Sequence, residues 1–281
     1  MRAVVLDRDR QPRLDDVSEP GGNGELVRVL ACGLCGSDVE KIGRASPGTV
    51  LGHEVVAERD EGERVALVHH LPCGECERCR AGHESTCAQF AEATIVPGGF
   101  AERARATASV DLPSAIDDAL GTYAEPLACV FRGAERLPPG RVLVVGGGFI
   151  GRLFTAVLRN RGDEVFVHDR MPERATALPD GPVDAAVLCA RGGAATALAS
   201  VAPGAVVLVF ADAGWLDLDP VYRAELTVVG SRSATPRHVR EAIELLPSLD
   251  VPEPLTLPLE RFAEGLDLYR RGEAMKVVFV P

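Results

Sequence analysis

Four cysteines lie close together in a loop rich in Gly, Glu and Arg: Cys73, Cys76, Cys79 and Cys87, with the spacing C-x2-C-x2-C-x7-C. Four thiolates so near in sequence can surround one tetrahedral ion, and a closed set of four cysteines is typical of structural zinc. An iron–sulfur cluster is the main alternative, although the bacterial ferredoxin run ends in x3-C-P rather than x7-C. The remaining alternative is that the four cysteines are free thiols that bind no metal. The loop therefore predicts a zinc site that stabilises a lobe of the fold.

A second set of possible metal ligands is dispersed: Cys35 in GLCGSD, His53 in LGHE and Glu125 in YAEPLA. Each has an ordinary structural explanation, as a small buried thiol, a polar core residue or a charge at a helix N-terminus. Three protein ligands with one open position would make a catalytic zinc site. Spacing alone leaves these alternatives open.

A glycine-rich motif lies within residues 141–170, RVLVVGGGFIGRLFTAVLRNRGDEVFVHDR. Gly146, Gly148 and Gly151 have G-x-G-x-x-G spacing. An apolar run precedes them, and a helical pattern, a second apolar run and Asp169 follow. Such glycines let backbone N–H groups approach a pyrophosphate at a helix N-terminus, and the acidic residue binds ribose hydroxyls. A glycine triplet alone is weak evidence, but the full context predicts a dinucleotide-binding site.

The chain changes character near residue 141. Before it, short apolar or alternating runs separated by Gly- and Pro-containing turns predict a small antiparallel barrel or sandwich, followed by a helical stretch. After it, apolar runs alternate with helical patterns, as in a parallel sheet with crossover helices. A Pro-rich segment, 247–258, is expected to cross back to the first half. The expected strands are 3–6, 25–31, 50–57, 64–68, 100–107, 142–145, 164–168, 183–189, 205–211, 226–230 and 276–280, and the main helices are 126–137, 153–159, 193–201, 235–246 and 259–271.

Composition limits the classes of function. The net charge of −11 argues against nucleic acid as a partner, because nucleic acid requires a basic face. The sequence shows no signal-peptide pattern and no apolar run long enough to span a bilayer, so we expect no membrane association and a cytoplasmic location. In that setting the eight cysteines favour metal ligands or reduced thiols over disulfides.

These motifs, in this order, resemble the zinc-dependent medium-chain alcohol dehydrogenases, and most of all their sorbitol- and threonine-dehydrogenase branch. The motifs are GLCGSD, LGHEVV, CGECERCRAGHESTC, GGFAE, YAEPLA and VVGGGFIG. The resemblance runs from MRAVVL to KVVFVP and covers essentially the whole chain. It implies an α/β protein with two domains. A GroES-like, mostly β catalytic domain would span residues 1–126 and be completed by 250–281, and a Rossmann domain with a doubly wound parallel sheet would span 127–249.

The resemblance also implies two zinc ions per chain. Cys35, His53 and Glu125 are the ligands that it assigns to a catalytic zinc, and the four-cysteine loop would hold a structural one. Glu54 is the alternative carboxylate ligand, since some relatives exchange carboxylates at that position. The residues expected to contact NAD are Gly146, Gly148, Phe149, Ile150, Gly151, Asp169, Arg170 and Arg174.

Three further residues receive roles from the resemblance. Asp38 would hold the histidine ligand in orientation, and Ser37 would take the substrate proton. Relatives often carry histidine where this chain has Glu40, which is either the terminal base of the proton relay or a solvated surface carboxylate.

Two segments are shorter than in the family. The connection between Glu54 and Arg64 is brief, so a surface loop of the catalytic domain is expected to be trimmed. The segment between Asp169 and Asp184 is also short, at a place where relatives fit another strand and helix. One edge strand of the nucleotide-binding sheet is therefore expected to be missing, which would expose a new sheet edge.

The function that the resemblance implies is NAD-linked oxidation of a secondary alcohol: a polyol, a sugar-derived alcohol or an amino alcohol. Zinc would act as a Lewis acid on the substrate oxygen, and the nicotinamide would accept hydride. NADP-linked ketone reduction is the alternative chemistry, because Arg170 and Arg174 could meet a 2′-phosphate that Asp169 would repel. A non-catalytic zinc- and nucleotide-binding relative is the alternative of another class. A homodimer or homotetramer is expected.

Overall fold

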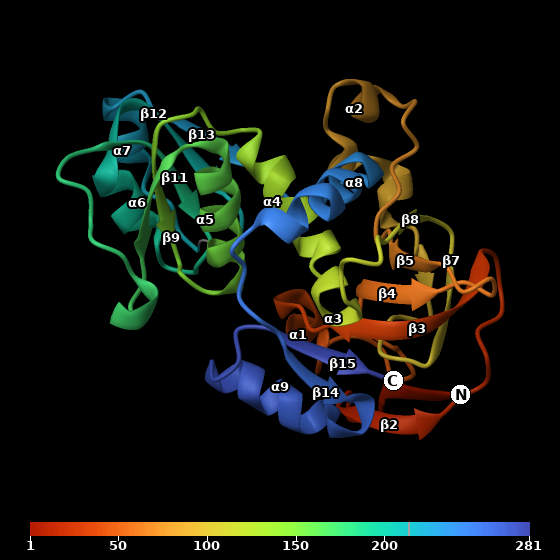
Figure 1. Ribbon diagram of the computed structural model, residues 1–281. Coiled ribbons are helices and arrows are strands. Elements are labelled where there is room, and N and C mark those ends of the chain that lie inside the picture. Colours follow the sequence, from red (N-terminus) through yellow and green to blue (C-terminus); the bar gives the residue numbers. More distant parts are fainter. Residues whose placement is uncertain (213) are drawn as a thin grey trace. The chain divides into compact units, whose positions relative to one another are not determined.

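The computed structural model describes residues 1–212 and 214–281, which pack as two units (Figure 1). The first unit consists of Met1–Ala128, Ala234–Pro247 and Glu253–Pro281, and the second of Cys129–Ser233 and Ser248–Pro252. The domain limits expected from the sequence stay a prediction. Among the described residues, no helix is long and apolar enough to cross a membrane.

The first unit is built on an eight-stranded, mostly antiparallel sheet with the main order β14-β15-β3-β4-β5-β8. Strand β7 pairs with β3 and with β6, and β1 and β2 form a separate hairpin. The strands are β1 (Arg2–Leu6), β2 (Pro12–Asp16), β3 (Glu25–Gly33), β4 (Glu54–Glu58), β5 (Arg64–Leu67), β6 (Ile95–Val96), β7 (Arg103–Ala106), β8 (Ser109–Asp111), β14 (Leu255–Pro258) and β15 (Val277–Val280).

The two ends of the chain meet in this sheet. Strand β15 pairs antiparallel with β3, so that Val278 lies opposite Gly33 and Phe279 opposite Cys32. Phe279 also packs against Phe262 and Phe100, with ring centroids 4.6 and 5.7 Å away, in the core of the unit. The C-terminal segment therefore belongs to the sheet of the first unit.

The α-helices of the first unit are α1 (Gly36–Lys41), α2 (Glu77–Arg80), α3 (Asp118–Gly121), α8 (Pro236–Leu245) and α9 (Phe262–Arg271). The Asp117 side chain caps α3 by accepting a hydrogen bond from the Leu120 N–H, 2.8 Å. Helix α4 (Ala124–Ala134) contains the limit between the two units.

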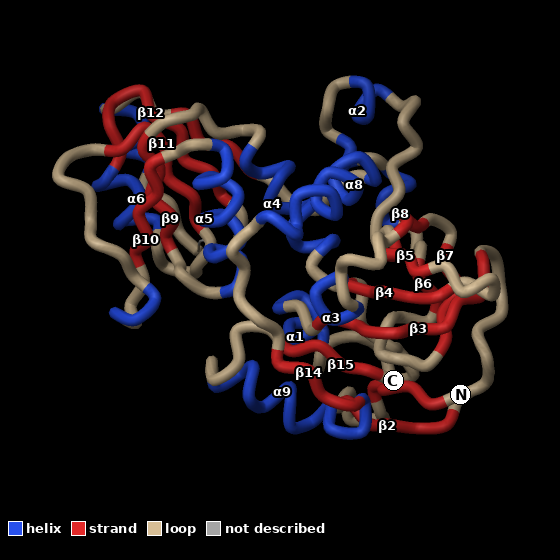
Figure 2. The backbone as a smooth tube through the Cα atoms, viewed as in Figure 1, coloured by secondary structure: helices blue, strands red, loops and turns tan. Residues whose placement is uncertain are grey.

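The second unit contains a five-stranded parallel sheet with the order β10-β9-β11-β12-β13. Figure 2 draws its strands in red and its helices in blue. Helix α5 packs against β9 and β10, and α6 packs against β9, β11 and β12. The elements are β9 (Arg141–Val145), α5 (Phe149–Arg161), β10 (Glu164–His168), β11 (Val183–Leu188), α6 (Ala194–Ser200), β12 (Val201–Val209), α7 (Leu218–Arg223) and β13 (Thr227–Gly230).

This strand order confirms the trimmed sheet. A doubly wound dinucleotide-binding sheet has the order 3-2-1-4-5-6, and the described residues supply strands 2-1-4-5-6 without the third. Strand β10 is therefore an edge. Thr176 covers part of it: its N–H donates to the Val167 carbonyl, 2.9 Å, and its hydroxyl accepts from the Val167 N–H, 2.8 Å. These two bonds satisfy backbone groups that a missing neighbour would leave unpaired.

The differences from the expected secondary structure include the following two. The strand expected over 50–57 begins only at Glu54, because Gly52 has φ +96° and turns the chain. The segment 247–258, expected as a crossing, ends in β14, which pairs parallel with β15.

Candidate functional site

The side chains of Cys35, His53 and Glu54 converge in the first unit, where one donor atom from each lies within 4.8 Å of the others. Cys35 is the N-cap residue of α1, immediately after β3. Glu54 is the first residue of β4, the antiparallel neighbour of β3, and His53 immediately precedes it. Pairing of two neighbouring strands thus brings together donors that belong to separate sequence motifs.

Glycines allow this close approach. A Cβ at Gly52 would lie 2.7 Å from Cys32 Sγ and 2.8 Å from the Phe100 backbone nitrogen, and its positive φ is disfavoured for other residues. The turn before His53 therefore requires glycine.

Asp38 holds His53. Its Oδ1 lies 3.2 Å from His53 Nδ1 and accepts from the Gly52 N–H, while its Oδ2 accepts from the Cys35 N–H. Burial opposes ionisation of Asp38, but the charge of His53 and these hydrogen bonds lower the pKa of Asp38 below its usual value. Burial likewise disfavours a charged His53, yet the Asp38 carboxylate raises the pKa of His53 well above its ordinary range. Because Nδ1 is engaged, Nε2 is the nitrogen left for a metal.

Glu54 has a charged partner that the sequence did not suggest. Its carboxylate forms an ion pair with the Lys276 ammonium, which also donates to the Leu34 carbonyl, and each side chain is 1% exposed. A Cβ at Gly33 would lie 3.0 Å from Lys276 Cε, so glycine makes room for the pair. The pair fixes the Glu54 carboxylate beside Cys35 and His53.

The remaining expected catalytic residues lie as follows. Glu125 is half-buried in the first turn of α4 and does not belong to the group of donors within 4.8 Å. Ser37 and Glu40 are exposed on α1, the helix that follows Cys35. The structure thus places Glu54, the alternative carboxylate, beside the other two donors.

This donor set fits zinc. A thiolate, an imidazole and a carboxylate are all zinc ligands, and three protein ligands leave one position of a tetrahedral ion for substrate. The Asp38–His53 hydrogen bond is the second contact that metal-binding histidines usually make.

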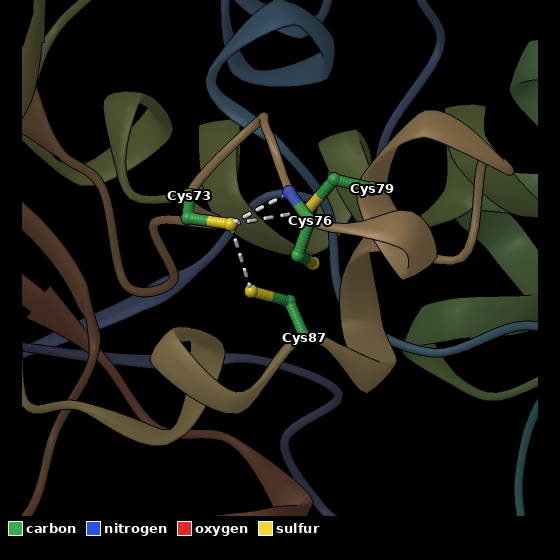
Figure 3. Close-up of side chains that lie close together, drawn as sticks. All are labelled: Cys73, Cys76, Cys79 and Cys87. Atoms are coloured by element: carbon green, nitrogen blue, oxygen red, sulfur yellow. Dashed lines mark hydrogen bonds between the residues drawn. The ribbon is translucent and has the colours of Figure 1, made fainter.

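The four cysteines of the loop also converge, with their sulfur atoms within 4.8 Å of one another (Figure 3). Cys73 Sγ lies 3.6 Å from Cys87 Sγ and 3.9 Å from Cys79 Sγ, and it accepts from the Cys76 N–H at 3.3 Å. A hydrogen bond from the Cys73 backbone lowers the pKa of Cys87 to about 6, which favours a thiolate there. Four thiol donors at these separations fit a closed structural zinc site.

The glycine-rich motif borders a hollow of about 390 Å³ in the second unit. It lies at the carboxyl ends of β9, β10 and β11, where strand order reverses, the place at which such sheets bind ligands. A Cβ at Gly151 would lie 1.8 Å from the Gly146 carbonyl oxygen, so the third glycine lets α5 approach the turn. The residues that line the hollow include Gly146, Gly148, Asp169, Arg170 and Arg174 of the expected set, whereas Phe149, Ile150 and Gly151 begin α5.

Asp169 already has backbone partners. Its Oδ2 accepts from the Gly147 N–H at 2.7 Å and its Oδ1 from the Met171 N–H at 2.9 Å. The carboxylate therefore braces the glycine-rich turn and still has acceptor capacity for ribose hydroxyls.

Several residues near the three donors were missed from the sequence. The rings of His53, His69, His70 and Phe90 form a continuous stack, with successive centroids 4.5, 3.9 and 4.2 Å apart. Tyr269 of α9 also lies near: burial, followed by the charges of Cys35 and Glu54, raises its pKa. No spacing rule predicts such contacts, because they join distant parts of the chain.

The fold and the two donor sets define a two-unit protein, with a metal-binding β-rich unit and a dinucleotide-binding sheet. Residues 22–114 match the alcohol dehydrogenase GroES-like domain. This match lies within the first unit and covers about a third of the chain.

Proteins of similar sequence include named dehydrogenases. L-galactonate-5-dehydrogenase of Escherichia coli strain K12 is 30% identical over 178 residues, which are 57% of this chain and 52% of that protein. L-idonate 5-dehydrogenase (NAD(P)(+)) of the same strain is 32% identical over 166 residues, 50% and 48% of the two chains. The chain thus spans about half the length of these curated relatives. The solved alcohol dehydrogenase of Thermus sp. ATN1 superposes with a TM-score of 0.84 at 26% identity, covering 100% of both chains.

Proposed function

We propose that this chain is an oxidoreductase that transfers hydride between a secondary alcohol and NAD. The observation that carries the proposal is the convergence of Cys35, His53 and Glu54, with Asp38 fixing the histidine. A purely structural ion would be better served by a closed donor set, like that of the four cysteines.

The ion, when bound, supplies a Lewis acid that favours the alkoxide form of the alcohol. Cys35, His53 and Glu54 hold that ion, and Asp38 keeps the His53 ring aimed. Ser37 is proposed to accept the substrate proton, because it lies on the exposed side of α1 just after Cys35. Glu40, exposed on the same helix, is proposed as the terminal acceptor, since a solvent-exposed carboxylate can take up a proton and pass it to water.

The proposed cofactor is NAD. Asp169 at the end of β10 offers carboxylate oxygens to ribose hydroxyls and would repel a 2′-phosphate. The competing possibility, NADP-linked ketone reduction, gains support from Arg170, Arg174 and Arg191, which line the same hollow. Replacing Asp169 by Ala should narrow the preference for NAD, and a wild-type protein with a higher kcat/KM for NADP would contradict the proposal.

The proposed substrates are polyols and sugar-derived alcohols, which agrees with the names of the relatives. The direct test is a panel of polyols, sugar acids and amino alcohols with NAD and with NADP. Absorbance of the reduced nicotinamide is followed, and zinc is measured in the same sample. We expect two zinc ions per chain and NAD-dependent turnover of at least one secondary alcohol. Two bound ions without any turnover would favour the non-catalytic alternative.

We also propose that the chain forms a homodimer or homotetramer. Three large apolar side chains are exposed in the second unit: Trp215 (97%), Leu218 (68%) and Tyr222 (81%). Leu218 and Tyr222 belong to α7, and Trp215 lies three residues before that helix begins. Strand β13 is an unpaired sheet edge in the same unit, as far as the described residues go. Exposed apolar side chains and an open sheet edge in the same unit support burial against a second copy.

A further inference from the structure

A second hollow, of about 290 Å³, lies directly beside His53. This volume is close to the lower end of the range for small-molecule pockets. His53, Asp38 and His69 belong to its wall, and Lys41 and Thr49 provide further polar groups. Since His53 is one of the three donors, the hollow adjoins the proposed metal site at that side chain.

Lys41 is the cationic residue of the wall. It ends α1 and is exposed, and it makes no ion pair with the residues that the structure describes. The carboxylate nearest in the wall, Asp38, is already bonded to His53, Cys35 and Gly52. The ammonium of Lys41 is therefore available to a ligand in the hollow.

His69 adds a second polar side chain to the wall, and its ring centroid lies 4.5 Å from that of His53. The nitrogen atoms of an imidazole can form hydrogen bonds with hydroxyl groups, as a polyhydroxylated ligand requires. Lys41 is thus the wall residue that can distinguish an anionic ligand from a neutral one.

Composition gives an independent indication that a lysine side chain has a particular role at position 41. Of the 30 basic residues, only Lys41 and Lys276 are lysines, so the other 28 are arginines. Both lysines lie at the candidate site, one in the wall of the hollow and one paired with Glu54. An ammonium is a compact charge with three donors, whereas a guanidinium is a wide planar fork. A chain that otherwise uses arginine uses the compact cation at these two positions.

We propose that Lys41 is a specificity-determining residue that binds a carboxylate of the substrate, so that the preferred alcohols are polyhydroxy acids rather than neutral polyols. This inference rests on the proposed function and names its substrate class. The hydroxyl to be oxidised lies at the proposed zinc site, and the carboxylate lies within reach of Lys41.

The test compares acids with neutral alcohols of matched configuration: L-idonate with L-iditol, and D-gluconate with D-glucitol. The zinc-loaded wild-type protein is measured beside Lys41→Met, which keeps the aliphatic stem, and Lys41→Arg, which keeps the charge. Arg44→Met is the matched control, because Arg44 is exposed three residues farther along and does not line the hollow.

The wild type should oxidise an acid at least about 10-fold more efficiently than its hexitol. Lys41→Met should lower the ratio of kcat/KM for acid over hexitol by about 10- to 100-fold, because a hydrogen bond to a charged group is lost. Most of the change should be in KM for the acid. Lys41→Arg should recover part of the ratio, and Arg44→Met should match the wild type.

Two results would overturn the inference. If Lys41→Met lowers efficiency equally on acid and hexitol, Lys41 does not recognise a carboxylate. If it instead raises KM for NAD alone, the anion at Lys41 is a cofactor phosphate. Calorimetric measurement of acid binding distinguishes failure of the anion site at Lys41 from failure of the proposed alcohol oxidation. If the acid binds in a way that depends on Lys41 but is not turned over, the anion site is supported and the proposed oxidation is refuted. If alcohols are oxidised without a preference for acids, the proposed oxidation is supported and the anion site at Lys41 is refuted.

Discussion

Glu54 and Lys276 form an ion pair that is almost wholly removed from water. Each charge has lost its hydration, so the carboxylate depends on the ammonium, or on a metal ion, for compensation. Gly33 leaves the space that the pair occupies. A residue near the end of the chain therefore controls the charge balance at donors that lie in its first fifth.

Replacing Lys276 by Met should expose this dependence. With zinc removed by a chelator, the variant should lose about 3–5 kcal/mol of unfolding free energy, because Glu54 is left buried without a counter-charge. Chemical denaturation measures the loss. Arg28→Met is the control: it breaks the Arg28–Glu58 pair, whose arginine is 59% exposed, and should change stability by about 1 kcal/mol or less. Equal losses of unfolding free energy in the two variants would refute the expectation that the buried Lys276–Glu54 pair matters more for stability than the exposed Arg28–Glu58 pair.

At the residue scale the sequence predicts the metal-donor residues better than it predicts the residues that contact them. Cys35 and His53 stand in short motifs with flanking glycines, and Asp38 follows Cys35 at fixed spacing, so all three can be identified from the sequence. Lys276 and His69 reach the site only through strand pairing and ring stacking, which spacing cannot show. Two carboxylates, Glu125 and Glu54, were candidates for the third donor, and only the fold places Glu54 beside the thiol.

Among the elements, the four-cysteine loop contains little regular structure besides α2 and two short 3₁₀ turns, Glu84–Thr86 and Ala88–Ala91. Its small core consists of Cys79, Cys87 and Phe90, which cannot bury enough surface to hold a loop by itself. Phe90 also stacks on His70, so an ordered loop supports the ring beside His69.

Changing Cys76 to Ser should therefore release one zinc ion per chain and lower the melting temperature, because a structural site contributes folding free energy directly. Elemental analysis and thermal unfolding measure the two effects. Cys129→Ser, which alters a thiol outside both donor sets, should keep both ions. Iron with acid-labile sulfide in the purified wild type would contradict the assignment of zinc to the loop.

In the turn between β9 and α5, two glycine-to-alanine variants are expected to differ clearly in stability. Gly151→Ala should cost about 1–3 kcal/mol of unfolding free energy and abolish NAD binding, because its Cβ would meet the Gly146 carbonyl at 1.8 Å. Gly148→Ala places a Cβ where no heavy atom lies within 4 Å and should leave stability nearly unchanged. Denaturant titration with calorimetry of NAD binding tells them apart. Equal stabilities would show that α5 can shift to accommodate the methyl group.

Elements with a strong local pattern were predicted well. Strand β10 matches its expected limits, because a run of alternating β-branched and aromatic residues ends at a turn. Residues 50–53 were wrongly expected to be strand, since apolar composition does not reveal the left-handed turn at Gly52. Strand β14 was missed because its pairing partner, β15, lies beyond α9 in the chain.

For the whole molecule, the third strand that the described residues of the second unit lack could be predicted from the shortness of the segment between Asp169 and Asp184. The way in which the exposed edge is covered could not be foreseen. Thr176 covers it with its own N–H and hydroxyl, a solution that depends on where an irregular segment returns.

Assembly is a property of the whole molecule as well. Light scattering should give a mass that is a multiple of 29.8 kDa, and Trp215→Glu together with Tyr222→Glu should lower it, because charges would then face the second copy. Leu178→Glu, at a side chain that is 62% exposed, is the matched control and should leave the mass unchanged. A monomeric wild type would refute the proposed dimer or tetramer.

The scarcity of lysine has a practical consequence for chemistry on this protein. Reagents that acylate amines find two lysine side chains, and Lys276 is 1% exposed whereas Lys41 is open to solvent. The remaining amine, at Met1, donates a hydrogen bond to the Val17 carbonyl at 2.9 Å. Brief acetylation should therefore modify the Lys41 side chain ahead of Lys276, as peptide mass spectrometry can measure. A bound carboxylate should slow that modification, which makes a covalent label a measure of occupancy that needs neither cofactor nor turnover.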